Sequence, residues 1–185
     1  RLFAVSDAPV KIVQLKLTNR TNRTRRINAT YYVEWVLGDN HENMAQYIVP
    51  EFDSQRFALL ARNPYNPEYG NHVAFLAATR EIHWVTTDRL EFLGSLGSYT
   101  RPAALERVGL SASVLAGSDP CAAMQILFWL APGESKEVTY LLGQGKDRLE
   151  AMDLIQQFQA IPNLESAWDA VGKHWDSLLD TIQVQ

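Results

Sequence analysis

The chain has 185 residues, of which 46% are hydrophobic, and this length and composition allow a single domain with a sizeable buried core. Its formal net charge of -4 provides no overall field that would draw the molecule to nucleic acid or to an anionic membrane. A single cysteine, Cys121, excludes an internal disulfide and a thiolate metal cluster.

The first predicted elements are two strands on either side of a polar turn. In "KIVQLKLT", residues 11–18, apolar and polar side chains alternate as they do in a half-buried strand. The stretch "INATYYVEWVL", residues 27–37, alternates in the same way and predicts a second strand. The Asn, Arg and Thr residues between them favour a turn. We therefore predict that the two strands form an antiparallel hairpin.

This turn contains four arginines, Arg20, Arg23, Arg25 and Arg26, among three Asn-x-Thr triplets. Nucleic-acid binding usually recruits several basic elements, and the acidic remainder of the chain opposes it. Glycosylation of the triplets needs a secretory context, and residues 1–10 lack the long apolar segment of a signal peptide. We interpret the arginines as solvated side chains at a hairpin tip and predict no nucleic-acid partner.

The middle of the chain contains further short segments that are rich in β-forming residues and bounded by Gly, Pro, Asn or Asp. A Pro-Gly turn, residues 131–135, is predicted to join the last two segments as a hairpin. No helix-length periodic segment interrupts the first 140 residues, which favours an antiparallel sandwich over a βαβ sheet. The predicted strands are residues 72–78, 81–87, 124–130 and 137–143.

The last part of the chain changes to helical patterns. Residues 146–159 are helix formers with apolar side chains at three-residue spacing, and Pro162 is predicted to break this helix. A second helix is predicted from an N-cap at Asn163 nearly to the C-terminus. Its apolar stripe carries Trp168 and Trp175, so we expect these rings to be partly exposed or covered by a partner.

The segment "LLARNPYNPEYGNHVAFLA", residues 59–77, is a candidate carbohydrate-binding loop. Its residues Arg62, Asn63, Tyr65 and Asn66 offer a guanidinium, two amides and a flat ring, which suit sugar hydroxyls and the apolar faces of sugars. The alternative is a rigid structural loop whose polar groups cap strand ends. We select these four residues as candidate carbohydrate-binding residues.

Other residues show no pattern that is specific for catalysis or metal binding. Glu51 and Asp53 share a strand face, as paired catalytic carboxylates can, but a solvated strand edge is the simpler interpretation. The four histidines lack metal-ligand spacing, and no glycine-rich phosphate loop occurs. Cys121 precedes an apolar strand and is interpreted as a buried structural thiol. We predict no catalytic residue, no metal site and no cofactor.

Six separated phrases in the chain resemble, in order, the N-terminal β-sandwich of the glycoside hydrolase family 94 (glycosyltransferase family 36-like) region of bacterial cyclic β-1,2-glucan synthases. This resemblance covers nearly the whole sequence. It implies a mainly β, antiparallel super-sandwich of the galactose-mutarotase type in residues 1–145, followed by linker helices in residues 146–185 that lead into an (α/α)-barrel catalytic domain. The phrases are "LTNRTNRTRRINATYYVEWVLG", "LLARNPYNPEYGNHVAFLA", "TTDRLEFLGSLGS", "PAALERVGLSASVLAGSDPCAAMQ", "LAPGESKEVTYLLGQG" and "HWDSLLDTIQVQ".

The resemblance also implies a function and partners. In the family, the barrel carries the general-acid Asp and the phosphate site for inverting phosphorolysis of β-glucosidic bonds, so this chain is expected to be a non-catalytic, carbohydrate-associated domain. Its expected partners are the downstream barrel of the same polypeptide, which would begin just after residues 182–185, and β-glucan. A homodimer is left open as a further association.

The implied location is the cytoplasmic side of the bacterial inner membrane, within a larger membrane protein. No apolar run in the chain approaches the roughly 20 residues of a membrane-spanning helix, so we expect no direct membrane insertion by this chain. Two other functions stay open: an autonomous β-glucan-binding module, and a mutarotase-like enzyme. The enzyme would need a His and Glu pair facing one sugar pocket, chosen from His72, His83, Glu51 and Glu34.

Overall fold

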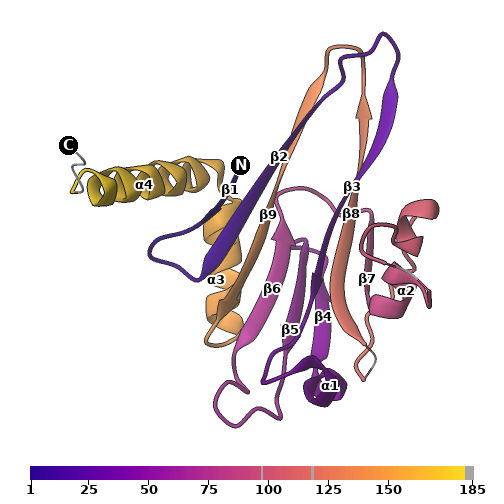
Figure 1. The fold of residues 1–185 in the computed structure, drawn as a ribbon, viewed down its shortest axis with the longest axis vertical. Coiled ribbons are helices and arrows are strands. Elements are labelled where there is room, and N and C mark those ends of the chain that lie inside the picture. Colours follow the sequence, from indigo (N-terminus) through magenta and orange to yellow (C-terminus); the bar gives the residue numbers. More distant parts are fainter. Residues whose placement is uncertain (97, 118, 182–185) are drawn as a thin grey trace.

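The computed structural model describes residues 1–96, 98–117 and 119–181 and shows two sheets packed face to face (Figure 1). The larger sheet has the strand order β1-β2-β9-β6-β5-β4, and the smaller has the order β3-β8-β7. Every pairing between named strands is antiparallel, so the predicted antiparallel sandwich is confirmed. The strands are β1 (Leu2–Ala4), β2 (Val10–Thr18), β3 (Arg25–Glu34), β4 (Val49–Asp53), β5 (Ala58–Arg62), β6 (Val73–Ala78), β7 (Trp84–Asp88), β8 (Pro120–Leu130) and β9 (Ser135–Gly145).

Long helices occur only after β9 in the described part of the chain, as the sequence predicts. Pro162 does not separate them in the predicted way, because it lies in the first turn of α4, where its missing N–H costs no hydrogen bond. Asn163 is therefore not the N-cap, and its side chain donates to the carbonyl of Gln157 instead. The helices are α1 (His41–Met44), α2 (Arg89–Leu93), α3 (Arg148–Gln159) and α4 (Ile161–Leu179), with 3-10 turns at η1 (Ala45–Tyr47) and η2 (Ala103–Glu106).

The two predicted hairpins, one around the arginine-rich turn and one around the Pro-Gly turn, are wrong, because the strands that each turn joins do not hydrogen-bond to each other. Strand β2 pairs with β9, and β3 pairs with β8, so each turn carries the chain from one sheet to the other (Figure 1). The apolar faces of the joined strands oppose each other across the core, which a flat hairpin could not achieve. Alternation predicts that a strand has a buried face, but it does not identify the neighbouring strand. We call these two turns, residues 19–24 and 131–134, the arches.

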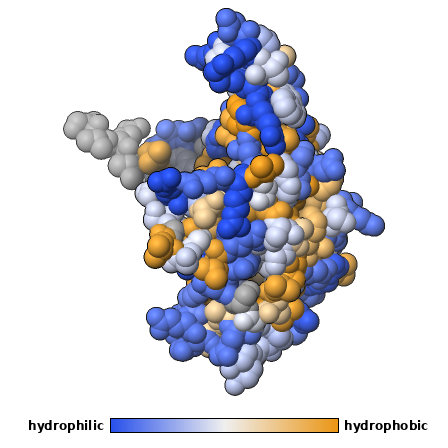
Figure 2. Space-filling view, turned by 90° about the vertical axis from the view of Figure 1, so that its right-hand side faces the viewer, coloured by the Kyte–Doolittle hydropathy of each residue, from blue (hydrophilic) through white to orange (hydrophobic). Residues whose placement is uncertain are grey.

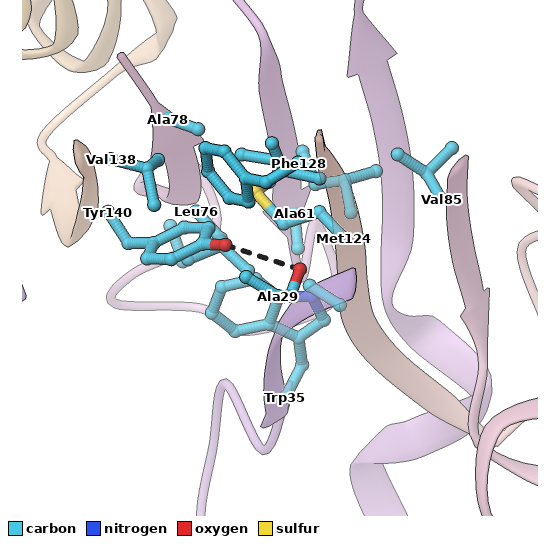
Figure 3. Close-up of a cluster of buried hydrophobic side chains, with 14 of the residues drawn as sticks. Ala29, Trp35, Ala61, Leu76, Ala78, Val85, Met124, Phe128, Val138 and Tyr140 are labelled. Atoms are coloured by element: carbon cyan, nitrogen blue, oxygen red, sulfur yellow. Dashed lines mark hydrogen bonds between the residues drawn. The ribbon is translucent and has the colours of Figure 1, made fainter. Parts of the chain in front are cut away.

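The core between the sheets is built from the inner faces of both. Tyr140 of β9 reaches across from the larger sheet, and its hydroxyl donates to the carbonyl of Ala29 on β3 at 3.4 Å (Figure 3). Trp35, Met124 and Phe128 pack in the same cluster. Burial raises the pKa of Tyr140, which therefore stays protonated as a donor.

The outer face of the larger sheet is also buried, because α3 covers it. Ala151, Ile155 and Phe158 of α3 are buried in one cluster with Ile12 and Phe75 of the sheet. This helix begins at the N-cap Asp147, whose side chain accepts a hydrogen bond from the N–H of Glu150. The first helix after β9 thus packs as an outer layer of the sandwich, while the division into a sandwich and a linker at residue 145 stays a prediction.

Helix α4 extends away from the sandwich (Figure 1). Trp168 contacts Phe3 of β1 edge to face at 5.2 Å and lies 5.3 Å below the guanidinium of Arg1. Trp168 is 37% exposed and Trp175 is 53% exposed, so the predicted partial exposure of both rings is confirmed. The segment 182–185, which was expected to precede the barrel, lies outside the described residues.

Candidate functional site

The candidate loop is the connection of a β-hairpin at the lower end of the molecule in Figure 1. Strand β5 already includes Arg62, so only residues 63–72 form the loop. Successive side chains of a strand point to opposite faces of the sheet. Arg62, the last residue of β5, therefore shares the outer face of the sheet with Leu60, whereas Asn63 and Asn66 line a separate hollow, so the four predicted residues do not line one site.

Asn63 is an anchor of this loop. It is 2% exposed, its Nδ2 donates to the carbonyl of Leu37 at 2.9 Å, and its Oδ1 accepts from the N–H of Tyr65 at 3.1 Å. Met44 Sδ lies 3.5 Å from the same Nδ2. The amide thus ties the loop to the segment between β3 and α1. These contacts agree with the alternative interpretation, in which residues 59–77 form a rigid structural loop whose polar groups bond to the backbone.

Tyr65 and Asn66 have different surroundings from Asn63. Tyr65 is 65% exposed and stacks on Tyr47, with ring centroids 4.2 Å apart and planes 11° apart. Asn66 Oδ1 accepts from the backbone N–H groups of Glu68 and Tyr69 and so stabilises the next turn of the loop. One face of the aromatic pair and part of the Asn66 amide remain available to a ligand.

A hollow of about 420 Å³ lies beside this loop, at the lower end of the space between the sheets. Among the described residues, Asp39, His72 and Gln144 contribute polar side chains to it that have no hydrogen bond, ion pair or other polar partner on the protein. Tyr69 contacts the His72 ring edge to face at 5.0 Å. We call this hollow the loop pocket; it is lined by Leu37, Gly38, Asp39, Asn63, Asn66, Tyr69, His72, Ala74 and Gln144.

Arg62 lines a different hollow, of about 830 Å³, on the outer face of the larger sheet beside the start of α3. Arg148 in this groove pairs with Glu51 at 2.5 Å and lies 3.8 Å from Asp53. Both carboxylates belong to β4, an edge strand as predicted, but they face Arg148, and the side chain of Asp53 is only 18% exposed, so the edge is not simply solvated. Arg62 itself forms no ion pair within the described ranges, and it stays a predicted sugar contact.

The residues proposed for a mutarotase-like pair are not brought together by hydrogen bonds. Nδ1 of His83 accepts from the N–H of Leu127, and His72 lies in the loop pocket. Glu34 lies in the smaller sheet, where one oxygen accepts from Tyr32, Arg89 and Tyr99. Burial alone would raise the pKa of Glu34, but these three hydrogen bonds outweigh it and lower the pKa.

The described part of the chain was compared with the geometry of metal sites and of membrane-spanning helices. No group of three or more His, Cys, Asp or Glu side chains there has the arrangement of a metal site. No helix in those ranges has both the length and the apolar character needed to cross a bilayer. Cys121 is fully buried, as predicted, and burial raises the pKa of its thiol, so it is a poor nucleophile.

Four of the six polar side chains around the loop pocket were not among the predicted sugar contacts, and two of these four lie outside the candidate segment 59–77. Asp39 follows β3, and Gln144 comes from β9, far from the loop in sequence. The signal that could have found Gln144 is its pairing with Ala74, the second residue of β6. That pairing depends on the strand order, which hydrophobic alternation alone does not supply.

Comparison with known proteins shows the domain family to which the chain is similar. The sequence pattern of the family "Glycosyl hydrolase 94, supersandwich domain" matches residues 1–161. The chain is 29% identical, over 96% of its length, to cyclic beta-(1,2)-glucan synthase NdvB of Rhizobium meliloti, of which it covers 6%. It is 26% identical, over its whole length, to N,N'-diacetylchitobiose phosphorylase of Vibrio proteolyticus and to solabiose phosphorylase of Paenibacillus borealis, covering 23% and 24% of them.

Proposed function

Because this chain belongs to the glycosyl hydrolase 94 supersandwich family, we propose that it is the non-catalytic, carbohydrate-associated domain of a β-glucan-processing enzyme. In this proposal an adjoining (α/α)-barrel of the same polypeptide carries out phosphorolysis, and the enzyme is of the cyclic β-1,2-glucan synthase type. The chain covers less than a quarter of each of the three relatives compared above, so most of such an enzyme lies outside it. The sandwich supports the barrel and contributes to the sugar site.

The observation that carries the sugar-side role is the loop pocket. It gathers a carboxylate, an imidazole and three amides beside a phenol ring, and three of these groups are unused by the protein in its described part. Sugar hydroxyls need directional donors and acceptors of this kind next to a flat apolar face. Tyr65 of the loop is exposed and stacks on the half-buried Tyr47 of η1, and its ring can receive a neighbouring sugar ring.

The exposed apolar face of α4 supports a barrel that packs against this helix. Only Leu164 of this helix is buried, while Trp175, Leu178 and Leu179 are each about half exposed. A run of large apolar side chains on one side of a helix normally packs against another element. In this proposal the barrel covers that face, while Trp168 keeps the start of the helix on β1.

Steady-state kinetics of the full-length protein with β-1,2-glucan test the sugar-side role. We expect Gln144→Ala and Tyr69→Ala to lower kcat/KM for phosphorolysis by about tenfold each, because each removes one directional contact. Lys11→Ala, on the exposed start of β2, is the matched control and leaves kcat/KM unchanged. Unchanged kinetics in both pocket variants, with normal folding, would remove the loop pocket from the sugar site.

The same assay decides the part played by Arg62. This residue lies on the opposite face of the sheet from the loop pocket, in the groove with Glu51 and Arg148. If glucan also follows that face, Arg62→Ala lowers phosphorolysis without unfolding the sandwich, as the sequence predicts. Unchanged kinetics would restrict the sugar contacts to the loop-pocket side of the sheet.

An autonomous β-glucan-binding module is the second candidate, and the exposed Tyr65 ring, stacked on Tyr47, favours it. Titration of the 185-residue chain with β-1,2-glucan separates the two functions. A half-open pocket should bind with a dissociation constant in the millimolar range, about 4 kcal/mol. A micromolar constant, about 8 kcal/mol, would support the autonomous module. The chain alone should release no glucose 1-phosphate from glucan and phosphate.

A further inference from the structure

The upper end of the molecule, opposite the loop pocket, concentrates positive charge. The arch 19–24 and the first residues of β3 carry Arg20, Arg23, Arg25 and Arg26, although the whole chain has a net charge of -4. The two arches project beyond the rest of the sandwich, and Figure 2 shows their surface as mainly hydrophilic. We call this end the basic tip.

The arginines of the basic tip are free of internal charge partners. Arg20, Arg23 and Arg26 are exposed, and none of them forms an ion pair within the part of the chain that the structure describes. Arg25 donates only to the hydroxyl of Thr21. Guanidinium groups without carboxylate partners retain their full attraction for external anions, and their planar fork suits phosphate oxygens.

The acidic residues near the basic tip do not neutralise these arginines. Glu134 accepts from the N–H of Ala131 at 2.8 Å and pairs with Lys136 at 3.4 Å. Glu137 pairs with Lys16 at 2.9 Å. Each carboxylate is therefore matched by a lysine, and the charge of the four arginines remains in excess at this end.

An aromatic ring accompanies the charge. Trp129 of β8 is 57% exposed and lies opposite Arg26, whose guanidinium is 5.9 Å from the ring centroid. Lys136 donates to the backbone carbonyl of Trp129 at 2.8 Å. An exposed indole beside cationic side chains is typical of surfaces that rest at the boundary between lipid headgroups and acyl chains.

The tip is also rigid enough to present these groups in a fixed arrangement. Asn19 is 3% exposed, and its Nδ2 donates to carbonyls of Arg23, Leu130 and Ala131. Backbone hydrogen bonds from Asn19 to Glu134 and from Gly133 to Asn19 join the two arches. A charged patch on a fixed turn loses less conformational entropy on binding than one on a flexible tail.

We infer that the basic tip is a docking surface for an anionic phospholipid bilayer, with the arginines at the headgroup phosphates and Trp129 at the headgroup boundary. This goes beyond the proposed carbohydrate function and does not depend on it. Two projecting turns form a convex end, which can meet a flat surface. A nucleic acid strand is usually bound along a charged groove with several stacking rings, and in the described part of the chain Trp129 is the exposed ring beside the arginines.

Vesicle co-sedimentation of the 185-residue chain tests this docking. We expect binding to equimolar phosphatidylcholine and phosphatidylglycerol vesicles, no binding to pure phosphatidylcholine vesicles, and weaker binding as salt is raised. The double variant Arg20→Glu, Arg23→Glu should lower the partition coefficient by at least about tenfold. Trp129→Ala should lower it by a smaller factor.

The matched control is Lys11→Glu, Lys173→Glu, which makes the same charge change at exposed positions away from the tip. It should keep most of the binding, and circular dichroism melting shows whether each variant is folded. The inference is overturned by equal binding to neutral and anionic vesicles, by equal losses in the tip and control variants, or by no vesicle binding at all. A gel shift with single-stranded RNA but no vesicle binding would assign the tip to nucleic acid instead.

Discussion

The two ends of the sandwich are fixed by the same kind of residue but present different chemistry. At the upper end, the buried amide of Asn19 joins the two arches, and the exposed side chains around it are arginines. At the lower end, the buried amide of Asn63 joins the β5–β6 loop to the carbonyl of Leu37, and the surrounding side chains are mainly neutral hydrogen-bonding groups.

The comparison shows that a buried side chain anchors each loop, while different side chains of the same loop face solvent. A buried amide satisfies carbonyls that secondary structure leaves unpaired, so it fixes the backbone of the loop. Neighbouring residues on that fixed backbone are then free to vary in charge and shape. Asn63 and Asn66 illustrate this division, because the first faces the protein and the second is partly open to the loop pocket.

The largest expected effect is at the upper anchor. The two hydrogens of the Asn19 amide are shared among three carbonyls, and its Oδ1 accepts from the N–H and hydroxyl of Thr21. Asn19→Ala should lower the free energy of unfolding by about 3 kcal/mol, because one buried and two partly buried carbonyls lose a donor. Urea denaturation measures this, with exposed Asn22→Ala as a control that costs about 0.5 kcal/mol or less.

The lower anchor should cost less. Asn63→Ala removes one donor to Leu37 and one acceptor for Tyr65, so we expect a loss of about 2 kcal/mol in the free energy of unfolding. Asn71→Ala, at an exposed position in the same loop, is the matched control. A loss larger than that of Asn19→Ala would contradict the ranking of the two ends, because it would mean that the lower loop carries more of the stability.

The sequence predicted the layers of this fold better than their connections. Alternation in residues 27–37 correctly assigned the inner face of β3, where Ala29 and Tyr31 meet Tyr140. The same alternation in β2 missed that Ile12 is buried on the opposite face by α3. A local pattern predicts which face of a strand is buried. Which strand pairs with it, and which helix covers its other face, depends on contacts far apart in sequence.

The candidate site was predicted in part for the same reason. The loop was identified from its amides and rings, and Asn66 does line the loop pocket. Composition could not distinguish a buried amide from an exposed one, so Asn63 was placed on the sugar side, and Asn19 was interpreted only as a turn residue. Gln144 and Asp39 reach the pocket through strand order, which no local motif encodes.

The smallest expected effect is the loss of local stability when the pH is lowered. It tests whether the two ends of the sandwich lose their hydrogen-exchange protection at the same pH. At the lower end of β3, Glu34 accepts from Tyr32, Arg89 and Tyr99, and these bonds outweigh the opposing effect of burial and lower its pKa. Because the folded pKa lies below the unfolded one, the stability from Glu34 is present above the unfolded pKa and is lost as pH falls through the folded pKa.

The upper end has a corresponding group in Glu134, whose pKa is lowered mainly by the N–H of Ala131, but this carboxylate lies at the surface, where solvent screens it. Hydrogen–deuterium exchange from about pH 6 to about pH 3 should therefore show protection factors falling at Trp35 and Arg89 before they fall at Asn19 and Gly133. Glu34→Gln should remove this difference between the ends, and Glu134→Gln should leave it. A simultaneous loss of protection at both ends in the unmodified chain would show that acid acts on the sandwich as one cooperative unit, with no separate contribution from the Glu34 cluster.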